Sequence, residues 1–225
     1  MSLRIAALVP AYQAAAHLGE VLLRIRALDA PPHVLVVDDG SRDATAEVAR
    51  QFGTEVLSFA ANRGKGHALL AGFRHLASYD GVITLDADGQ HPPECIPSFL
   101  AAAAAGADLV LGTRERSADM PPHRRFANAF SSNWCSAIAG QRISDSQCGY
   151  RLYSRALLNG TTVAASRYEV ETEMAVRAAR AGFKLAEVPI PTVYGDETSH
   201  LSVTRDVPRI IAMMLRLTFE PRPRR

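Results

Sequence analysis

Short apolar runs alternate with helical patterns along most of the chain. Within the runs nearly every residue is apolar, which is typical of strands covered on both faces of a sheet. Between them, apolar residues recur at every third or fourth position, as in helices packed on one side. This alternation predicts an α/β fold with a mostly parallel central sheet flanked by helices. Strands are expected at residues 3–10, 33–39, 54–59, 81–88, 107–114 and 184–194, and helices at 15–28, 41–52, 62–77, 92–106, 166–182 and 203–219.

The length of the chain, 225 residues, suits one domain of this class. No internal repeat, low-complexity tract or linker interrupts the pattern, so a single domain is expected over residues 1–225. It divides into a first half to about residue 115, a second half from about 116 to 200, and a C-terminal amphipathic helix over about 203–219.

Local signals refine two helix starts. Ser41 is expected to be the N-cap of the second helix. The sequence NRGKGHA places two glycines before the third helix, as phosphate-binding loops do. It matches neither GxxxxGK[ST] nor GxGxxG, because Leu69 stands where the second pattern needs its third glycine. We therefore interpret Gly64 and Gly66 as parts of a tight turn.

Composition excludes several classes of protein. Hydrophobic residues make up 48% of the chain and charged residues 21%, as in a globular protein, and a net charge of +2 is too small to indicate a nucleic-acid partner. Cys95, Cys135 and Cys148 are widely spaced, which favours free thiols in a reducing compartment over a disulfide framework or a zinc site. The first apolar run stops at Pro10, and no uncharged apolar stretch of about 18 residues occurs. A cytoplasmic location is expected.

Distinctive residues follow three of the expected strands. Residues 10–12 end the first strand, Asp38 and Asp39 end the second, and Asp86 and Asp88 end the fourth. In open α/β sheets, ligands bind outside the carboxyl ends of the strands. These residues are therefore expected to lie in one site.

The stretch LDADGQHPP, residues 85–93, has the ligands of a divalent-cation site. Asp86 and Asp88 point the same way if the strand continues through them. Together with the amide oxygen of Gln90 they are hard oxygen ligands, which suit Mg²⁺ or Mn²⁺. In an alternative that remains open, the motif is a polar turn in which Asp88 caps a helix starting near Pro92.

The segments VPAYQ, VVDDGSRDAT, NRGKGHAL, LDADGQHPPE, GTR and DSQCGYRLY, in this order, resemble glycosyltransferase family 2. Within that family they are most similar to the polyprenyl-phosphate sugar synthases, such as dolichyl-phosphate mannose and glucose synthases. The resemblance covers roughly residues 3–195. It implies the GT-A fold and an inverting transfer from a nucleoside-diphosphate sugar.

The resemblance places the nucleotide sugar on the first half of the chain. Tyr12 would pack on the base, and Asp39 would accept hydrogen bonds from the base or ribose, although Asp39 also suits a turn in DDGS. A cation held by the DxDxQ motif would bridge the two phosphates. Arg114 would add a fixed positive charge there, unless it is an exposed surface arginine. The residues expected at the donor are Pro10, Tyr12, Val37, Asp39, Lys65, Asp86, Ala87 and Asp88, with Asp86, Asp88 and Gln90 as the metal ligands.

One departure bears on the choice of nucleotide. The family often has an acidic residue two positions after the tyrosine, where this chain has Ala14. Both GDP- and UDP-linked sugars therefore remain candidates for the donor.

The second half is expected to hold the acceptor. Asp145 precedes a Gly-Tyr-Arg turn, and Glu171 best matches an acidic residue that faces the acceptor in the family. Acidic residues in a first helical turn are also ordinary partners of the helix dipole. The expected catalytic residues are Arg114, Asp145 and Glu171. The groups expected to bind the acceptor are Arg124, Arg125, Arg151, His200 and Arg205.

After the last expected strand the chain departs from the synthases. They commonly have an arginine and a Ser-Lys pair that hold phosphate, whereas this chain reads GDETSH. His200 stands near the lysine position, and His200 and Arg205 are the candidate substitutes. The departure leaves the acceptor open.

The C-terminal helix carries Ile210, Ile211, Met214 and Leu217 at helical spacing, and a basic tail follows it. Two interpretations remain open. The helix lies on a membrane surface, which would make the protein peripheral on the cytoplasmic face. Alternatively, it packs on the domain or forms a homodimer contact.

The leading hypothesis is a metal-dependent inverting glycosyltransferase that transfers a sugar from a nucleoside-diphosphate sugar to a polyprenyl phosphate such as dolichyl or undecaprenyl phosphate. Such an acceptor is already anionic and needs cations more than a base. An alternative enzyme acts on a hydroxyl of a glycan or small molecule and needs a carboxylate base. A second alternative is a non-catalytic nucleotide-sugar-binding protein, which has no need of an intact DxDxQ motif.

Overall fold

The computed structural model describes residues 3–114, 122–164, 167, 169–191 and 203–221, and of residues 122–127 and 203–206 it describes the backbone alone. Its centre is a seven-stranded sheet in the order β3-β2-β1-β4-β6-β5-β7. All neighbouring strands are parallel except β6, which runs antiparallel to both β4 and β5. The strands are β1 (Ile5–Ala11), β2 (His33–Asp38), β3 (Glu55–Ser58), β4 (Gly81–Thr84), β5 (Leu109–Arg114), β6 (Arg151–Ser154) and β7 (Leu185–Ile190).

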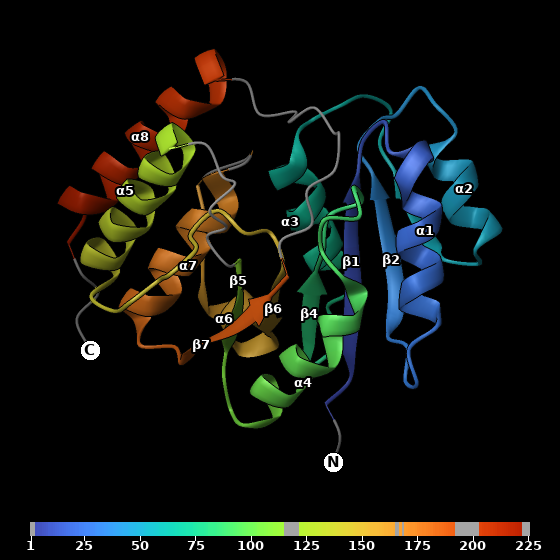
Figure 1. The fold of residues 1–225 in the computed structure, drawn as a ribbon, viewed down its shortest axis with the longest axis horizontal. Helices are drawn as coiled ribbons and strands as arrows, with labels where there is room; N and C mark the ends of the chain where they lie inside the picture. Colours follow the sequence, from blue (N-terminus) through green and yellow to red (C-terminus); the bar gives the residue numbers. More distant parts are fainter. Residues whose placement is uncertain (1–2, 115–121, 165–166, 168, 192–202, 222–225) are drawn as a thin grey trace.

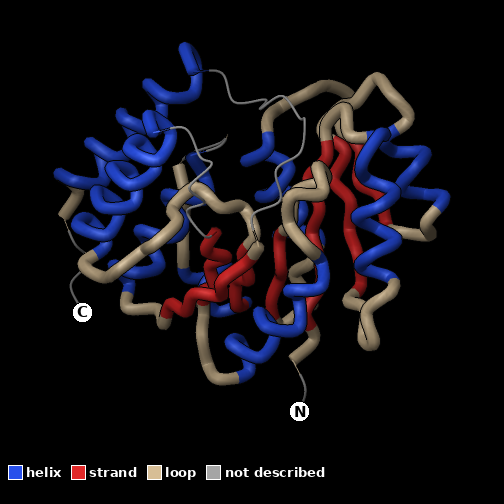
Figure 2. The backbone as a smooth tube through the Cα atoms, viewed as in Figure 1, coloured by secondary structure: helices blue, strands red, loops and turns tan. Residues whose placement is uncertain are grey.

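Helices cover both faces of the sheet, as the alternating pattern predicts (Figures 1 and 2). Successive side chains of a strand point to opposite faces. Ala6 and Leu8 accordingly pack with α3, α5, α7 and α8, whereas Ala7 and Val9 pack with α1 and α4. The helices are α1 (Ala15–Arg26), α2 (Thr45–Gln51), α3 (Lys65–His75), α4 (Ile96–Ala104), α5 (Pro122–Ala139), α6 (Arg155–Gly160), α7 (Glu169–Ala181) and α8 (Val203–Phe219), with a 3₁₀ turn, η1 (Pro93–Cys95), before α4.

The last helix, α8, packs against α5 and α7 at one end of the molecule (Figure 1). Among the side chains of α8 that the structure describes, Met213, Met214 and Leu217 are buried. Arg216 adds an ion pair to Glu173 of α7, with 2.7 Å between Nη2 and Oε1. In the described part of the chain, no helix combines the length and apolar character needed to span a bilayer.

Three local expectations were wrong. The helix α2 begins at Thr45 rather than at a cap on Ser41, because the Ser41 hydroxyl accepts the backbone N–H of Gln13 from the neighbouring loop instead. The strand expected at 81–88 ends at Thr84. A turn was expected at Gly-Tyr-Arg, residues 149–151, but Arg151 is the first residue of strand β6. This strand lies between β4 and β5.

Candidate active site

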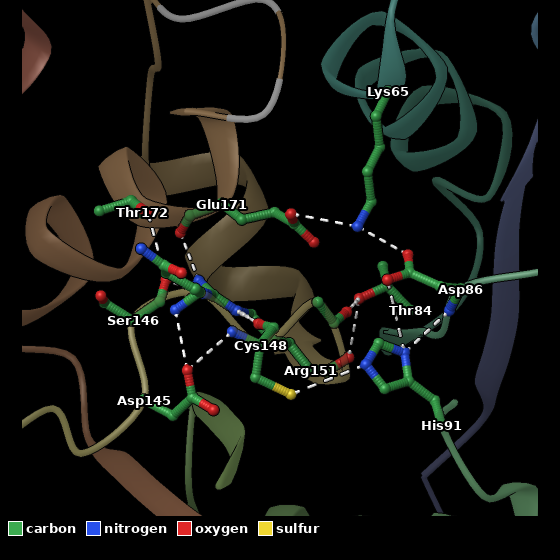
Figure 3. A network of polar contacts seen from close by, with 12 residues as sticks. Lys65, Thr84, Asp86, His91, Asp145, Ser146, Cys148, Arg151, Glu171 and Thr172 are labelled. Atoms are coloured by element: carbon green, nitrogen blue, oxygen red, sulfur yellow. Dashed lines mark hydrogen bonds and ion pairs between the residues drawn. The ribbon is translucent and has the colours of Figure 1, made fainter. Parts of the chain in front are cut away.

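Lys65, Asp86 and Glu171 meet at the carboxyl edge of the sheet, although they come from three distant parts of the chain (Figure 3). Asp86 follows β4, Lys65 is the first residue of α3, and Glu171 lies in the first turn of α7. The ammonium Nζ of Lys65 is 2.6 Å from Asp86 Oδ1 and 3.2 Å from Glu171 Oε2. One cation thus bridges a carboxylate of the first half of the chain and a carboxylate of the second half.

The surroundings of this cluster favour ionised side chains. Burial alone would lower the pKa of Lys65, but the carboxylates of Asp86 and Glu171 outweigh it and hold that pKa above its usual range. Burial also opposes ionisation of Asp86, yet the charge of Lys65 holds the pKa of Asp86 at about 2. Lys65 and Asp86 are therefore both charged at neutral pH.

Gly149, which precedes β6, forms the floor on which the three side chains meet. A Cβ atom at this position would lie 2.6 Å from Lys65 Nζ, 2.9 Å from Glu171 Oε1 and 3.1 Å from Asp86 Oδ2. Any side chain larger than hydrogen would occupy the space that the charged groups share. The glycine of the DSQCGYR segment thus has a steric role in the cluster.

His91 holds the turn that carries the two aspartates. Because β4 ends before Asp86, strand alternation does not decide where Asp86 and Asp88 point. Instead, His91 Nδ1 accepts the backbone N–H of Asp86 at 3.0 Å, and Asp88 Oδ1 accepts the backbone N–H of Gln90 at 3.0 Å. Burial lowers the pKa of His91, and a neutral ring leaves Nδ1 free to accept. The η1 turn lacks a side-chain cap, so capping by Asp88 is not its role.

Asp86 and Asp88 have the chemistry of a divalent-cation site. Mg²⁺ is usually held by one or two carboxylates, with water and phosphate oxygens completing the shell. The ammonium of Lys65 marks a position beside Asp86 where positive charge is stabilised, and Glu171 Oε1 is buried nearby without a hydrogen-bond partner. Among the described residues, no three His, Cys, Asp or Glu side chains gather into a metal-binding group. The carboxylates therefore fit a cation whose shell a phosphate ligand completes.

Asp39 holds the glycine-rich turn. Its two carboxylate oxygens accept the backbone N–H groups of Arg63 and Gly64 at 2.8 and 2.7 Å. Burial raises the pKa of Asp39, and these two hydrogen bonds oppose the rise. In the DDGS turn itself it is Asp38 that accepts a hydrogen bond, from the N–H of Ser41. The structure thus gives Asp39 a role in positioning the segment that begins with Lys65.

The other residues expected around the nucleotide differ in exposure. Tyr12, just after β1, is exposed. Pro10 and Val37 are neighbours in register across β1 and β2, and both are buried, as is Ala87. Tyr12 is therefore the member of this group whose exposed side chain can pack on a base.

Arg114, at the end of β5, and Asp145 form a two-pronged ion pair. Arg114 Nε donates to Asp145 Oδ2 at 2.8 Å, and Nη2 donates to Oδ1 at 3.2 Å. Burial opposes ionisation of Asp145, but the guanidinium of Arg114 holds the pKa of Asp145 below its usual range. Such a carboxylate is a weak base, so the geometry assigns Asp145 to positioning Arg114 rather than to proton transfer.

The expectation that Arg151 binds the acceptor was wrong. Arg151 is 0% exposed, and its guanidinium donates to the backbone carbonyls of Ser146 and Cys148, both at 2.7 Å, and of Glu171 (Figure 3). It ties the loop after Asp145 to the first turn of α7. Arg151 therefore shapes the site from beneath and does not face a ligand.

The remaining residues expected at the acceptor are Arg124, Arg125, His200 and Arg205. Arg124 and Arg125 lie at the start of α5, and Arg205 lies at the start of α8, by their backbone. Their side chains, and His200 entirely, lie outside the described residues. Their role in binding the acceptor stays a prediction.

Arg167 is a cationic residue that sequence reasoning missed. A Cβ atom on Gly64 would lie 3.2 Å from Arg167 Nε, so this guanidinium stands against the glycine-rich turn. Its Nε is buried without a hydrogen-bond partner. The only signal was its position before the acidic segment EVETE, and basic residues at such a position are common.

Comparison with known proteins identifies the family of the chain. The model of the family "Glycosyl transferase family 2" matches residues 6–163. An undecaprenyl-phosphate mannosyltransferase of Micrococcus luteus is 33% identical over 207 residues, which is 85% of this chain and 84% of that protein. A polyprenol monophosphomannose synthase of Mycolicibacterium smegmatis is 32% identical over 198 residues, covering 81% and 75%.

A solved structure shows the same fold. Glucosyl-3-phosphoglycerate synthase of Mycobacterium tuberculosis, crystallised with Mn²⁺, UDP and glucosyl-3-phosphoglycerate, superposes with a TM-score of 0.78 at 21% identity, covering 97% of this chain and 81% of that one. This likeness confirms the expected GT-A architecture. With the family match and the two relatives, it leads to one conclusion: the chain belongs to glycosyltransferase family 2 and is a glycosyltransferase.

Proposed function

We propose that this glycosyltransferase is metal-dependent and inverting, and that it transfers a sugar from a nucleoside-diphosphate sugar to a polyprenyl phosphate. The observation that carries the proposal is the charged cluster of Lys65, Asp86 and Glu171, which joins the expected donor half to the expected acceptor half. Two relatives about one-third identical are named for polyprenyl-phosphate acceptors, which supports the choice of acceptor. The solved relative with UDP supports a UDP-linked donor among the candidates.

In this proposal the first half of the chain binds the donor. Tyr12 packs on the base, and Asp86 and Asp88 hold the divalent cation, which when bound stabilises the negative charge that develops on the leaving diphosphate. Arg114, fixed by Asp145, directs its guanidinium toward the same phosphates. An oxygen of the acceptor attacks the anomeric carbon as the bond from that carbon to the diphosphate breaks.

A phosphate acceptor suits the electrostatics of the site. A hydroxyl must lose a proton during attack and therefore needs a base. Asp145 is a weak base because Arg114 lowers its pKa. A polyprenyl phosphate is already ionised and makes no such demand, whereas cations near the acceptor assist it.

One observation favours a second candidate, transfer to a hydroxyl. Glu171 Oε1 is buried, has no hydrogen-bond partner and lies in the cluster, so it is a carboxylate oxygen available to a proton. If Glu171 is the base, Glu171→Gln abolishes turnover while donor binding survives. If the acceptor is a phosphate, the same change lowers turnover less severely.

The test measures release of nucleoside diphosphate from GDP- and UDP-sugars with Mg²⁺ or Mn²⁺, with and without a polyprenyl phosphate. We expect release that depends on the lipid and that is lost in Asp88→Ala. Release that ignores the lipid would favour the hydroxyl acceptor. Binding of a nucleotide sugar without release under any condition would favour the non-catalytic binding protein.

The exposed side of α8 supports a peripheral contact with a membrane, where a polyprenyl acceptor resides. Ile211, Leu215 and Phe219 are spaced four residues apart and are 45%, 45% and 81% exposed. Phe130 of the neighbouring α5 is also exposed. The spacing of Ile211 had placed it on one face with Met214 and Leu217, which are buried. The structure places it with Leu215 and Phe219 in an exposed apolar stripe instead. An amphipathic helix of this kind binds an interface by its apolar side.

We expect the double change Leu215→Ser and Phe219→Ser to lower co-sedimentation with anionic lipid vesicles several-fold, because the apolar area that enters the interface is lost. The matched control is Leu23→Ser, which removes an exposed leucine of α1, 57% exposed, on another part of the surface. Unchanged vesicle binding by the double variant, or a loss of dimer in its place, would contradict the membrane contact.

We expect Gly149→Ala to lower turnover about tenfold or more, since a methyl group would push Lys65 and Glu171 from their positions. Gly53→Ala is the control: its φ of +66° makes alanine strained, but no atom lies within 4 Å of the added Cβ. The two variants are compared by thermal unfolding and by steady-state kinetics. Equal activity of the two at similar stability would show that the space above Gly149 is not needed.

A further inference from the structure

The chain has only two lysines. One of them, Lys65, neutralises the charge of Asp86, which is an expected metal ligand. Its ammonium contacts Asp86 Oδ1 at 2.6 Å and Glu171 Oε2 at 3.2 Å. The Asp86 contact is the shorter of the two, and Asp86 is the residue that the proposed cation needs.

We propose that Lys65 is the resident counter-cation of this site, that it competes with the divalent cation for Asp86, and that Glu171 retains its ammonium when Asp86 is taken by the metal. The proposal rests on the metal-dependent function proposed above. It adds a residue that sets metal affinity and an order of events: Lys65 leaves Asp86 as the metal arrives, and it stays on the acceptor side of the site.

Electrostatics makes the competition unavoidable. An ammonium in contact with a carboxylate stabilises its negative charge, and it does so more strongly in a partly buried site than in water. A divalent cation must replace that contact before it gains its own, and it also meets the repulsion of the ammonium at close range. The ammonium of Lys65 fills the space above Gly149, where an added Cβ atom would lie 2.6 Å from its Nζ.

Glu171 gives the displaced ammonium a second partner. The Glu171 side chain is 7% exposed, and its Oε1 has no hydrogen-bond partner. Glu171 can therefore bind the ammonium of Lys65 with both oxygens once the metal has replaced Lys65 on Asp86. Removing the charge of Glu171 would leave Lys65 with Asp86 alone. Changes at Lys65 and at Glu171 are therefore expected to alter metal affinity in opposite directions.

The experiment is a Mg²⁺ titration of the full chain followed by calorimetry and by NMR of ¹³C,¹⁵N-labelled lysine. Each of the two lysines gives one terminal Cε–Nζ signal. The signal that is missing from Lys184→Arg belongs to Lys184, and the remaining one belongs to Lys65. Lys184, just before β7, is exposed and donates to the carbonyl of Ala105 at 3.1 Å, so its signal is the internal control.

We expect the Lys65 signal to shift with Mg²⁺ while the Lys184 signal stays in place. Lys65→Met is expected to bind Mg²⁺ about tenfold more tightly than the wild type, and Glu171→Gln several-fold more weakly. Circular dichroism establishes that each variant is folded, and Lys65→Arg, which keeps the charge, should not show the tighter binding.

The outcomes separate this proposal from the function on which it rests. If Mg²⁺ binds wild type and Lys65→Met equally, or if both variants weaken binding, the competition is overturned while the metal site stands. If neither protein binds Mg²⁺ in the absence or presence of UDP, the metal assignment and the competition are both overturned.

Discussion

Replacing Asp86 with Asn is expected to lower kcat/KM for sugar transfer by about a hundredfold to a thousandfold. The change removes the carboxylate that Lys65 holds at 2.6 Å and that would bind the divalent cation. It leaves the backbone N–H of Asp86, which His91 accepts, so the turn keeps its main support. The loss should therefore appear in transfer and in metal affinity rather than in folding.

The measurement is steady-state release of nucleoside diphosphate over a range of metal concentrations. Asp29→Asn, which removes an exposed carboxylate of the loop after α1, is the control for a change in net charge. The role assigned to Asp86 would be wrong if the variant kept more than about a tenth of the wild-type kcat/KM at saturating metal, since that retains most of the expected stabilisation.

Arg151→Met is expected to lower the free energy of unfolding by about 3 to 5 kcal/mol. The guanidinium is fully buried and is the donor to three backbone carbonyls, which methionine leaves without partners. Urea denaturation measures the change, with an unchanged slope indicating that the same surface is exposed on unfolding.

Arg155→Met provides a matched control for that prediction. Arg155 also donates to three backbone carbonyls, of Phe73, Leu76 and Tyr79, but it is only partly buried, so water can replace it. We expect a loss below about 2 kcal/mol and nearly unchanged transfer activity. Equal losses in the two variants would show that burial of Arg151 adds nothing to its contribution.

The sequence allowed the fold to be predicted where elements are long and regular. The strands that became β1, β2 and β5 and the helices α1 and α3 have patterns that extend over several turns or pleats, so local physics indicates them. Strand β6 has four residues, RLYS, and three of them are charged or carry a hydroxyl group. Such a segment becomes a strand because β4 and β5 lie on either side of it. The pattern of its own four residues does not predict these neighbours.

The candidate site shows the same division. Asp86 and Lys65 were expected because each lies in a motif that is recognisable along the chain. The ion pair of Lys65 with Glu171 was not predicted, because it joins α3 to α7 and no pattern along the chain brings these two helices together. His91 and Arg151 were given other roles or none, since a role in holding backbone groups depends on how distant segments approach one another.

The antiparallel strand β6 also bears on how the chain reaches its folded state. Thr84 of β4 contacts Arg151 of β6 across a separation of 67 residues, and β5 joins the sheet through β6 and β7. A nascent chain ending near residue 115 can assemble β3-β2-β1-β4, but it lacks the strand that seats β5 and Arg114 beside them. Contacts so distant in sequence form late and slow the folding of a domain. The first 114 residues therefore cannot place Arg114 next to β4 until β6, which lies between β4 and β5, has been synthesised.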